Sequence, residues 1–395
     1  MIKVCYLMHG IYYGGATRSL HLLLKAIDNY QVEKYIVSIS CRANEIKSQL
    51  SQYVKQIKII KQNIISNNQI HYEDYISAMR KFDDDITQLI KFLLLNKINI
   101  LHINTSVFPH LLRIIKEAIP DLKIVTHIRE LIPKYDDGRL QEFFIRNISE
   151  YSEKIICISN NEFRYFQNNS NGIVIPNPFD FSSLYGLDPK LKSNYKISND
   201  IVLIGMLSHF SEKKGHLEYL KTLYLLKSLS IKKKFKFVII GMKKSQIIKK
   251  IVKNVIAKNN YEKKVIDFIN TNSLKDHIIL IPYTNRPLDY LADLDIVIRP
   301  SLEADPWGRD IIEAMALKKP IVATGTSEFF IENEKTGYLV SPRDPEQMLA
   351  KIIELINEPE KRKEFGEAGH RKIRQMCDLD EYGKKIFNIY SELLA

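Results

Sequence analysis

Short apolar runs alternate with longer segments of helical spacing along the chain, and this alternation restricts the fold more than any other feature of the sequence. In the first half, buried strands are expected at 2–8, 34–40, 57–60, 98–103, 123–127, 154–158 and from 173 onward. Helix-length segments such as 78–96 and 108–118 lie between several of these runs. Strands that alternate with helices predict a parallel sheet covered by helices on both faces.

The same pattern restarts at residue 201, after a polar stretch with little periodicity. Further strands are expected at 201–205, 237–241, 278–281, 295–298, 320–324 and 337–340. The sequence therefore predicts an N-terminal α/β domain over 1–182, a linker over 183–200 and a second α/β domain over 201–378. A C-terminal helix over 379–395 is expected to pack back toward the first domain. Two Rossmann-like doubly wound domains that face each other leave a cleft at the carboxyl ends of their strands, where ligands bind.

Charge and cysteine content restrict the partners and the compartment. Lys and Arg number 58 against 46 Asp and Glu, so the formal net charge of +12 favours anionic partners. The four cysteines lie far apart and form no Cys-x-x-Cys pair, which argues against structural zinc or a disulfide framework and indicates a reducing, cytoplasmic compartment. No apolar window reaches the length of about 18 residues that a membrane span requires. The basic charge is compatible with peripheral contact with the inner face of a membrane.

The stretch 299–324 carries the most chemical information. A strand leads into a loop, a helix is expected from about Gly308, and another strand follows. The unpaired N–H groups at such a helix start can hold a phosphate. Asp305 lies just before the helix and Glu313 lies inside it, and carboxylates suit the neighbouring hydroxyls of a sugar or ribose. The plainer interpretation is that Asp305 caps the helix and Glu313 pairs with a lysine.

This stretch resembles the signature of retaining glycosyltransferases of family 4, which have the GT-B fold: E-P-F-G-x-x-x-x-E-A-M-A-x-G-x-P-V-V-A-T. Asp305 stands at the first Glu of that signature, Glu313 at the second, and Lys318 where the family has Gly. The resemblance implies that Asp305 orients the donor sugar and Glu313 the ribose, with Glu303 as a nearby substitute for the first acid. It also places Trp307, Gly308 and Arg309 at the donor site.

Other segments resemble the family in the expected order. The donor loop Gly14-Gly15 follows the first strand, and the segment that starts at Gly205 has His209 at the family's Arg and Lys214 at its Lys. His127 ends a strand where the family often has a His near the donor sugar, and Glu328 lies in a shortened donor loop. The resemblance implies that Lys214, the helix start at Gly308 and the Gly14-Gly15 loop stabilise the leaving diphosphate.

The implied function is transfer of a sugar, with retention of configuration, from a nucleotide-sugar donor to a glycan or lipid-linked acceptor. The expected setting is the synthesis of a surface polysaccharide, either lipopolysaccharide or capsule. No cofactor besides the donor is implied, and no metal. The two literal Asp-x-Asp motifs, Asp83 to Asp85 and Asp293 to Asp295, lie in a helical pattern and at a helix-to-strand junction, and we interpret both as structural.

Three other classes of protein share some of these sequence features. A nucleotide-sugar epimerase on the same fold stays open. A dinucleotide-dependent oxidoreductase needs Gly-x-Gly-x-x-Gly after the first strand, and residues 9–15 lack that spacing. A nucleic-acid binder is suggested by the charge alone, without a recognised motif, so no nucleic acid is expected as partner. The sequence leaves open the nucleotide, the sugar, the acceptor and the oligomeric state, and whether His209 replaces the family's Arg.

Overall fold

The computed structural model describes residues 1–9, 14–39, 44–60, 72–79, 83–132, 138–229, 231–242, 260–303 and 307–395. The chain divides into two compact units. One consists of Met1–Pro178 together with Cys377–Ala395, and the other of Phe179–Met376. The chain therefore leaves the first unit once and returns to it for its last residues.

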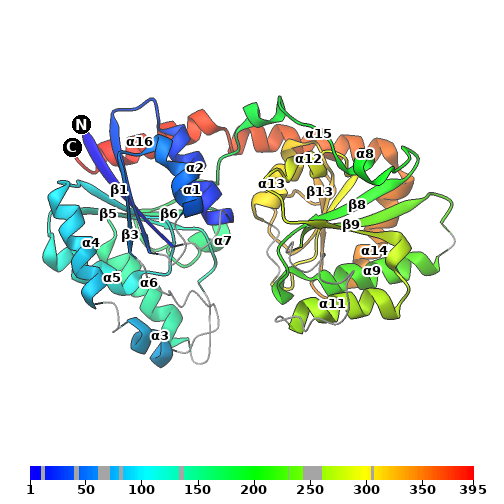
Figure 1. Cartoon of the computed structure of the whole chain (residues 1–395), viewed down its shortest axis with the longest axis horizontal. Coiled ribbons are helices and arrows are strands. Elements are labelled where there is room, and N and C mark those ends of the chain that lie inside the picture. The colour runs from blue at the N-terminus through cyan, green and yellow to red at the C-terminus, as the bar shows by residue number, and fades with distance from the viewer. Residues whose placement is uncertain are drawn as a thin grey trace. The chain divides into compact units, whose positions relative to one another are not determined.

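The first unit is built on a parallel sheet whose described strands follow the order β3-β2-β1-β4-β5-β6-β7 (Figure 1). These strands are β1 (Ile2–His9), β2 (Val32–Ile39), β3 (Gln56–Ile60), β4 (Ile100–Ile103), β5 (Lys123–Ile128), β6 (Lys154–Cys157) and β7 (Gly172–Val174). Each lies within a few residues of the apolar run that predicted it. The strand order is that of a doubly wound fold, and it reverses between β1 and β4.

Helices cover both faces of this sheet, and the side chains of β1 show why its sequence is apolar throughout. Cys5 and Leu7 join one core with α4 (Asp83–Leu95), α5 (Pro109–Ala118) and α6 (Arg139–Tyr151). Tyr6 and Met8 join another with α1 (Gly15–Ala26) and α16 (Leu379–Glu392). Successive strand side chains point to opposite faces, so a sheet covered on both faces needs continuous apolar strands. The helices of this unit are α1 (Gly15–Ala26), α2 (Asn44–Leu50), α3 (Tyr72–Met79), α4 (Asp83–Leu95), α5 (Pro109–Ala118), α6 (Arg139–Tyr151), α7 (Asn160–Phe163) and α16 (Leu379–Glu392).

The C-terminal helix α16 packs on α1 and completes the second of these cores. Tyr382, Ile386 and Tyr390 of α16 are buried there. The contact is close because Gly383 has no side chain: a Cβ at that position would lie 2.2 Å from the carbonyl oxygen of Ala26. The last residues of the chain are thus part of the first unit's interior.

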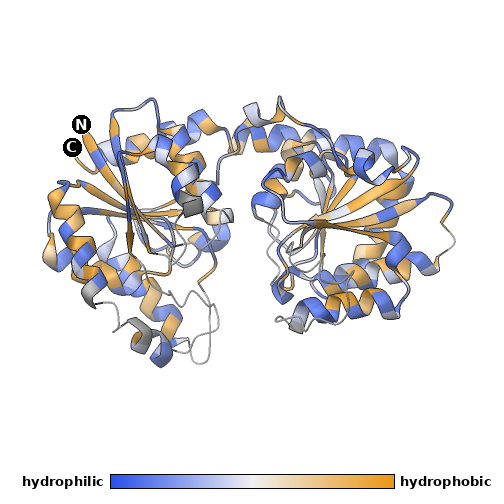
Figure 2. Ribbon diagram, in the orientation of Figure 1, coloured by the Kyte–Doolittle hydropathy of each residue, from blue (hydrophilic) through white to orange (hydrophobic). Residues whose placement is uncertain are grey.

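The second unit repeats the architecture with the strand order β10-β9-β8-β11-β12-β13, all neighbours being parallel. Its strands are β8 (Val202–Leu207), β9 (Phe235–Met242), β10 (Ile278–Pro282), β11 (Ile296–Arg299), β12 (Ile321–Thr324) and β13 (Gly337–Val340). Its helices are α8 (Leu191–Tyr195), α9 (His216–Ser228), α11 (Asn260–Thr271), α12 (Leu288–Leu291), α13 (Arg309–Ala316), α14 (Pro345–Asn357) and α15 (Pro359–Met376). In both units the strands are the most apolar elements, and the helices alternate between apolar and polar residues (Figure 2).

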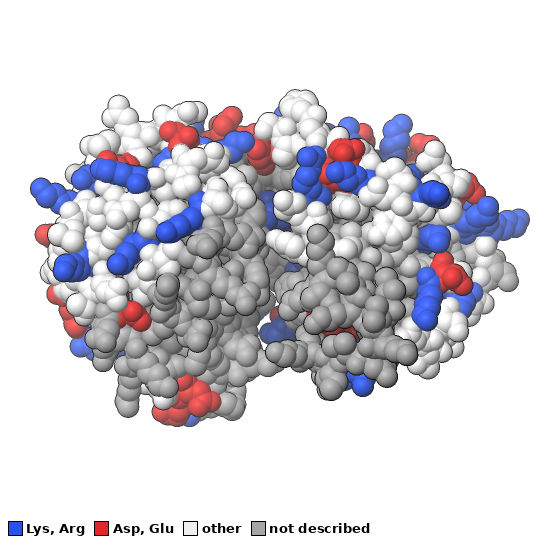
Figure 3. All heavy atoms as spheres, in the orientation of Figure 1, with Lys and Arg blue, Asp and Glu red and all other residues white. Residues whose placement is uncertain are grey.

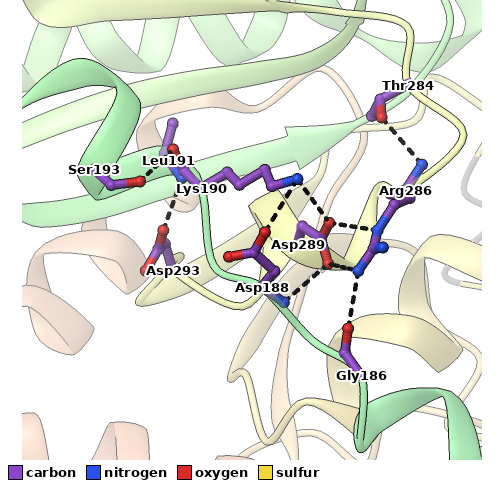
Figure 4. Close-up of polar contacts among 9 residues, drawn as sticks. All are labelled: Gly186, Asp188, Lys190, Leu191, Ser193, Thr284, Arg286, Asp289 and Asp293. Atoms are coloured by element: carbon purple, nitrogen blue, oxygen red, sulfur yellow. Dashed lines mark hydrogen bonds and ion pairs between the residues drawn. The ribbon is translucent and has the colours of Figure 1, made fainter.

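The segment 183–200, which its low periodicity suggested as a linker, belongs to the second unit. Asp293 accepts hydrogen bonds from the backbone N–H groups of Leu191 and Lys192, at 2.8 and 3.0 Å. The buried Asp289 accepts from the N–H of Asp188 at 3.2 Å and is paired with Arg286 (Figure 4). The linker prediction was therefore wrong: the segment is held through its backbone by carboxylates, and such contacts leave no apolar periodicity in the sequence.

Charged side chains are spread over the surface of both units. On the face seen in Figure 3, Lys and Arg lie among Asp and Glu in each unit rather than in one continuous block. Among the described residues, no helix combines the length and the apolarity that crossing a membrane requires. Cys5, Cys157 and Cys377 are buried, while Cys41 lies outside the described residues.

Candidate functional site

The second unit offers a site where its strand order reverses, between β8 and β11. In doubly wound sheets, ligands bind at the carboxyl ends of the strands at this reversal. The loop after β8 contains Lys214, and the loop after β11 leads into α13, which begins at Arg309. The topology thus brings together two segments that are almost one hundred residues apart and that the sequence had singled out separately.

These two loops are bonded to each other. The backbone carbonyl of Lys213 accepts hydrogen bonds from the N–H of Leu302 at 2.9 Å and from the hydroxyl of Ser301 at 3.2 Å. The ammonium of Lys213 pairs with Glu303 at 2.5 Å. Thr324, at the end of β12, donates to the carbonyl of Ser301 at 2.5 Å. The loop after β11 is therefore held from both sides, by the loop after β8 and by β12.

The N-terminal turn of α13 is fixed by an ion pair that the sequence did not reveal. Arg299, at the end of β11, donates through Nη1 to both carboxylate oxygens of Asp310, at 2.5 and 2.7 Å. Gly308 precedes the helix with a φ of 153°, and a Cβ there would lie 2.6 Å from Asp310 and 2.8 Å from Arg299. Glycine is thus required at this position, and the ion pair fixes the backbone at the helix start, where the first N–H groups have no acceptor within the helix itself.

Glu313 and Arg309 lie one turn apart on α13. The carboxylate of Glu313 has no exposed surface, and the Arg309 side chain is 11% exposed. The Nε of Arg309 lies 3.4 Å from Oε1 of Glu313. Trp307, immediately before the helix, is buried with 8% exposure. A buried carboxylate beside a guanidinium at a helix start can accept bonds from hydroxyls while the helix start binds an anion.

The other predicted residues of this unit differ in their surroundings. Lys214 is half-buried at the end of a short 3-10 helix, Glu212–Lys214, and His209 is exposed in the same loop. Glu328 is exposed in the loop after β12, where its carbonyl accepts from Lys372 at 3.0 Å. Gly205 lies inside β8, where a Cβ would lie 2.4 Å from Leu294; its lack of a side chain thus serves packing. Asp305 lies outside the described residues.

Both acids of the motif Asp293 to Asp295 accept hydrogen bonds from backbone N–H groups. Asp293 holds the backbone of α8, and Asp295 accepts from the N–H of Leu203 at 2.8 Å. Asp83 begins α4, so that motif lies on a helix as expected. Within the described ranges, no group of three or more His, Cys, Asp or Glu side chains is arranged to hold a metal ion.

In the first unit, the reversal lies between β1 and β4, and the predicted loop and histidine lie near it. Gly14 and Gly15 are exposed at the start of α1, with Gly14 as its N-cap. His127 lies in β5 and has no exposed surface. Burial, together with the nearby positive charge of Arg129, holds the pKa of His127 well below its usual range. His127 is therefore a neutral imidazole at physiological pH.

The neighbours of His127 hold one another in a network that the sequence did not predict. Arg129 donates through Nε to Asn104 at 2.8 Å and also donates to Asn177. Glu130 accepts from the hydroxyl of Thr105 and from the N–H and hydroxyl of Ser106, each at 2.7 Å. Through these contacts, Arg129 and Glu130 fix the loop after β4. No local pattern could reveal this, because the partners come from different strands.

A buried histidine gives the second unit a predicted dependence on pH. His216 is fully buried at the start of α9, stacked on Phe210, and burial lowers its pKa to about 4. In the unfolded chain its pKa is about 6.5, so between these values the unfolded state binds the extra proton. Stability attributable to His216 is therefore lost as pH falls below about 6.5, by about 2 kcal/mol between pH 7 and 5.

The measurement is urea unfolding at pH 7 and pH 5, followed by the fluorescence of Trp307, the only tryptophan in the chain. His216→Phe is expected to lose less stability than wild type on acidification, because it removes one group that must be neutral in the folded state. Equal losses for both proteins would contradict the assignment. Comparison with the variant cancels the contribution of the remaining titrating groups.

The sequence is similar to those of known glycosyltransferases. Residues 188–372 match the family model "Glycosyl transferases group 1". A poly(ribitol-phosphate) alpha-N-acetylglucosaminyltransferase of Staphylococcus aureus is 28% identical over 142 residues, which are 35% of this chain and 28% of that protein. The chain thus spans about a quarter of that relative's length. An uncharacterized glycosyltransferase of Methanocaldococcus jannaschii is 27% identical over 415 residues, covering 100% of this chain and 99% of that protein.

The fold agrees over the whole length. The crystal structure of Anabaena HepE in complex with UDP and glucose superimposes with a TM-score of 0.79, covering 99% of this chain and 100% of that one at 17% identity. The matched family model covers the unit in which the loops after β8 and β11 meet at α13. The second unit is therefore similar in sequence to the group 1 glycosyl transferases, and the chain has the two-domain α/β fold of glycosyltransferase structures, GT-B.

Proposed function

We propose that the protein is a retaining, metal-independent glycosyltransferase of family 4 that moves a hexosyl group from a nucleoside-diphosphate sugar to a glycan or lipid-linked acceptor. One observation carries the proposal. At the strand reversal of the second unit, the loop with Lys214 is bonded to the loop that leads into α13, and the buried Glu313 lies on that helix. Cationic and N–H groups next to a carboxylate suit a diphosphate joined to a ribose.

Each residue of this site has a proposed task. Lys214, Arg309 and the helix start at Gly308 stabilise the charge that develops on the leaving diphosphate. Glu313 accepts hydrogen bonds from the ribose hydroxyls, and Asp305 from those of the donor sugar. The acceptor hydroxyl attacks the anomeric carbon on the face that the diphosphate leaves, and the departing phosphate oxygen takes its proton. The bond to the diphosphate breaks as the new glycosidic bond forms, so no protein nucleophile is needed.

The proposed acceptor is part of a surface polysaccharide. One Staphylococcus aureus relative is named for transfer to a poly(ribitol-phosphate) chain, which its phosphates make anionic, and another is named for the biosynthesis of capsular polysaccharide. The net charge of +12 favours an anionic acceptor or its anionic membrane surroundings. We accordingly propose a cytoplasmic protein in peripheral contact with the membrane. We expect the protein to bind anionic vesicles at low salt and to lose this binding at high salt. We expect no binding to neutral vesicles.

The proposal is tested with purified protein, a panel of nucleoside-diphosphate sugars and EDTA. With the right donor and an acceptor glycan, we expect a glycosylated product whose anomeric configuration, read by NMR coupling, equals that of the donor. Donor alone is expected to give slow release of nucleotide and free sugar. Inversion would contradict retention, a need for added metal would contradict metal independence, and an epimerised nucleotide sugar would replace the transferase by the epimerase alternative.

Lys214→Ala is expected to lower kcat/KM by about 10- to 100-fold, because one charge-assisted hydrogen bond to a phosphate is worth about 1.5–3 kcal/mol. Steady-state kinetics with the active donor measures the effect. Lys233→Ala is the matched control, since Lys233 is an exposed lysine in the turn before β9. Similar rates for wild type and Lys214→Ala would remove Lys214 from the site.

A further inference from the structure

A chain of buried polar groups runs from the C-terminal helix to His127. The hydroxyl of Tyr390, on α16, lies 2.6 Å from Nδ1 of His102, on β4. Nε2 of His102 lies 3.2 Å from Nδ1 of His127, on β5. All three side chains have no exposed surface. Residues almost three hundred positions apart therefore form one connected row inside the first unit.

The donors in this row determine where the protons lie. Nη2 of Arg129 lies 3.3 Å from Nδ1 of His127, and a guanidinium can only donate. Nδ1 of His127 is therefore an acceptor, and the proton of its neutral ring is on Nε2. Since His102 meets the same Nδ1, its Nε2 must be the donor. Nδ1 of His102 is then an acceptor. The Tyr390 hydroxyl has a single proton and lies near two acceptors, Nδ1 of His102 at 2.6 Å and the hydroxyl of Tyr6 at 3.2 Å. We assign the proton to the shorter contact, so that Tyr390 donates to His102.

The far side of His127 is left with an unused donor. Its Nε2 is buried and has no hydrogen-bond partner in the described part of the chain. Burying an N–H group without an acceptor is unfavourable, so such a group persists where it serves a bound molecule. Hydroxyl, carbonyl and phosphate oxygens are the acceptors that fit it.

We propose that His102 and Tyr390 are positioning residues that hold His127 as an Nε2–H donor toward a substrate oxygen. In this arrangement His127 donates a hydrogen bond and does not act as a general base, because its only lone pair is occupied by His102 and Arg129. The C-terminal segment thereby controls a residue of the first unit's sheet. The kinetic part of this inference rests on the proposed transferase function; the proton positions do not.

The first test reads the proton positions directly. In protein with ¹⁵N-labelled histidine, two-dimensional NMR distinguishes protonated from unprotonated ring nitrogens, and His127→Gln identifies the signals of His127. We expect a protonated Nε2 and an unprotonated Nδ1 for His127 in wild type. A proton on Nδ1 of wild-type His127 would overturn the inference, even in a preparation that shows no transferase activity.

The second test uses variants of the row. His102→Gln keeps an N–H donor that can reach His127 and is expected to keep kcat/KM within a few fold of wild type. His102→Leu removes the donor, and a catalytic group displaced by about 1 Å can lose up to 100-fold in rate. We therefore expect a loss of about 10- to 100-fold for His102→Leu, a smaller loss for Tyr390→Phe, and altered His127 signals in both. Binding of the nucleoside diphosphate alone is expected to stay unchanged.

Tyr219→Phe is the matched control. Its hydroxyl is equally buried, in the second unit, and donates to the carbonyl of Ile204 at 2.5 Å. This variant is expected to lose stability without changing the His127 signals. Wild-type kcat/KM and wild-type His127 signals in His102→Leu would overturn the proposal, and so would equal losses in His102→Leu and His102→Gln. If wild type transfers no sugar from any donor, the proposed function fails, while the NMR result still decides the proton positions.

Discussion

Glu313→Gln is expected to lower kcat/KM by at least about 100-fold, since hydrogen bonds to a charged group contribute about 1.5–3 kcal/mol each and the carboxylate is proposed to accept two. The substitution keeps the size of a side chain that has no exposed surface. It replaces one acceptor oxygen by an NH₂ group, which cannot accept from a ribose hydroxyl. It also removes the negative charge beside Arg309.

The effect on binding is measured as thermal stabilisation by nucleoside diphosphates without metal. A ligand at 100 times its Kd stabilises the folded protein by about 2.7 kcal/mol, which raises Tm by about 5–10 °C for a unit of this size. We expect wild type to show such a shift with one nucleotide and Glu313→Gln to lose it. The fluorescence of Trp307 follows the same unit.

Glu262→Gln serves as the control for this prediction. Glu262 is a buried glutamate of the same unit, 3% exposed on α11, and is not among the residues of the proposed site. If neutralising any buried carboxylate weakened the unit, both variants would lose the nucleotide shift. Wild-type stabilisation of Glu313→Gln by the active nucleotide would exclude Glu313 from the donor site and leave the transferase proposal to rest on fold similarity.

The strands and the start of α13 could be predicted from the sequence because both follow from local rules. A parallel strand buried on both faces is a continuous apolar run, and the thirteen strands of the described residues lie at or near the expected positions. The helix predicted from about Gly308 begins at Arg309, since a glycine with a φ of 153° interrupts the preceding chain. These features depend on a few adjacent residues.

The interactions that fix the site depend on distant residues and could not be predicted in the same way. Arg299 and Asp310 are eleven positions apart across a loop, and the pair closes only when β11 and α13 are in place. His102 and Tyr390 meet only because α16 returns to the first unit. Arg and Asp are mostly exposed in proteins, and His and Tyr occur both inside and on the surface, so the presence of these residues in the sequence does not reveal the pairs. The segment 183–200 was misjudged for the related reason that its anchors are carboxylates rather than apolar side chains.

Gly215→Ala is expected to destabilise the second unit by about 3–5 kcal/mol, a loss typical of strained or overpacked sites. Two effects add. Gly215 has a φ of +72°, a conformation that costs an L-residue about 1 kcal/mol or more. In addition, a Cβ at this position would lie 1.7 Å from the carbonyl oxygen of Pro300. That oxygen belongs to the backbone, so the clash cannot be relieved by the movement of a flexible side chain.

Relief of that clash requires the loops after β8 and β11 to separate. The carbonyl of Lys213 would then lose the bonds from Ser301 and Leu302, and Lys214 would move away from the start of α13. Urea unfolding followed by Trp307 fluorescence measures the stability, and nucleotide titration of the folded variant measures the site. The same separation is expected to weaken nucleotide binding as well as folding.

Gly186→Ala is the matched control, because a Cβ at Gly186 would meet no atom within 4 Å. Its stability is expected to stay within about 0.5 kcal/mol of wild type or to rise slightly, since alanine restricts the unfolded chain. Equal stability of the two variants would contradict the close contact between the loops. A destabilised Gly215→Ala that still binds nucleotide with wild-type affinity when folded would show that the contact supports the fold alone, and that Lys214 reaches its ligand without it.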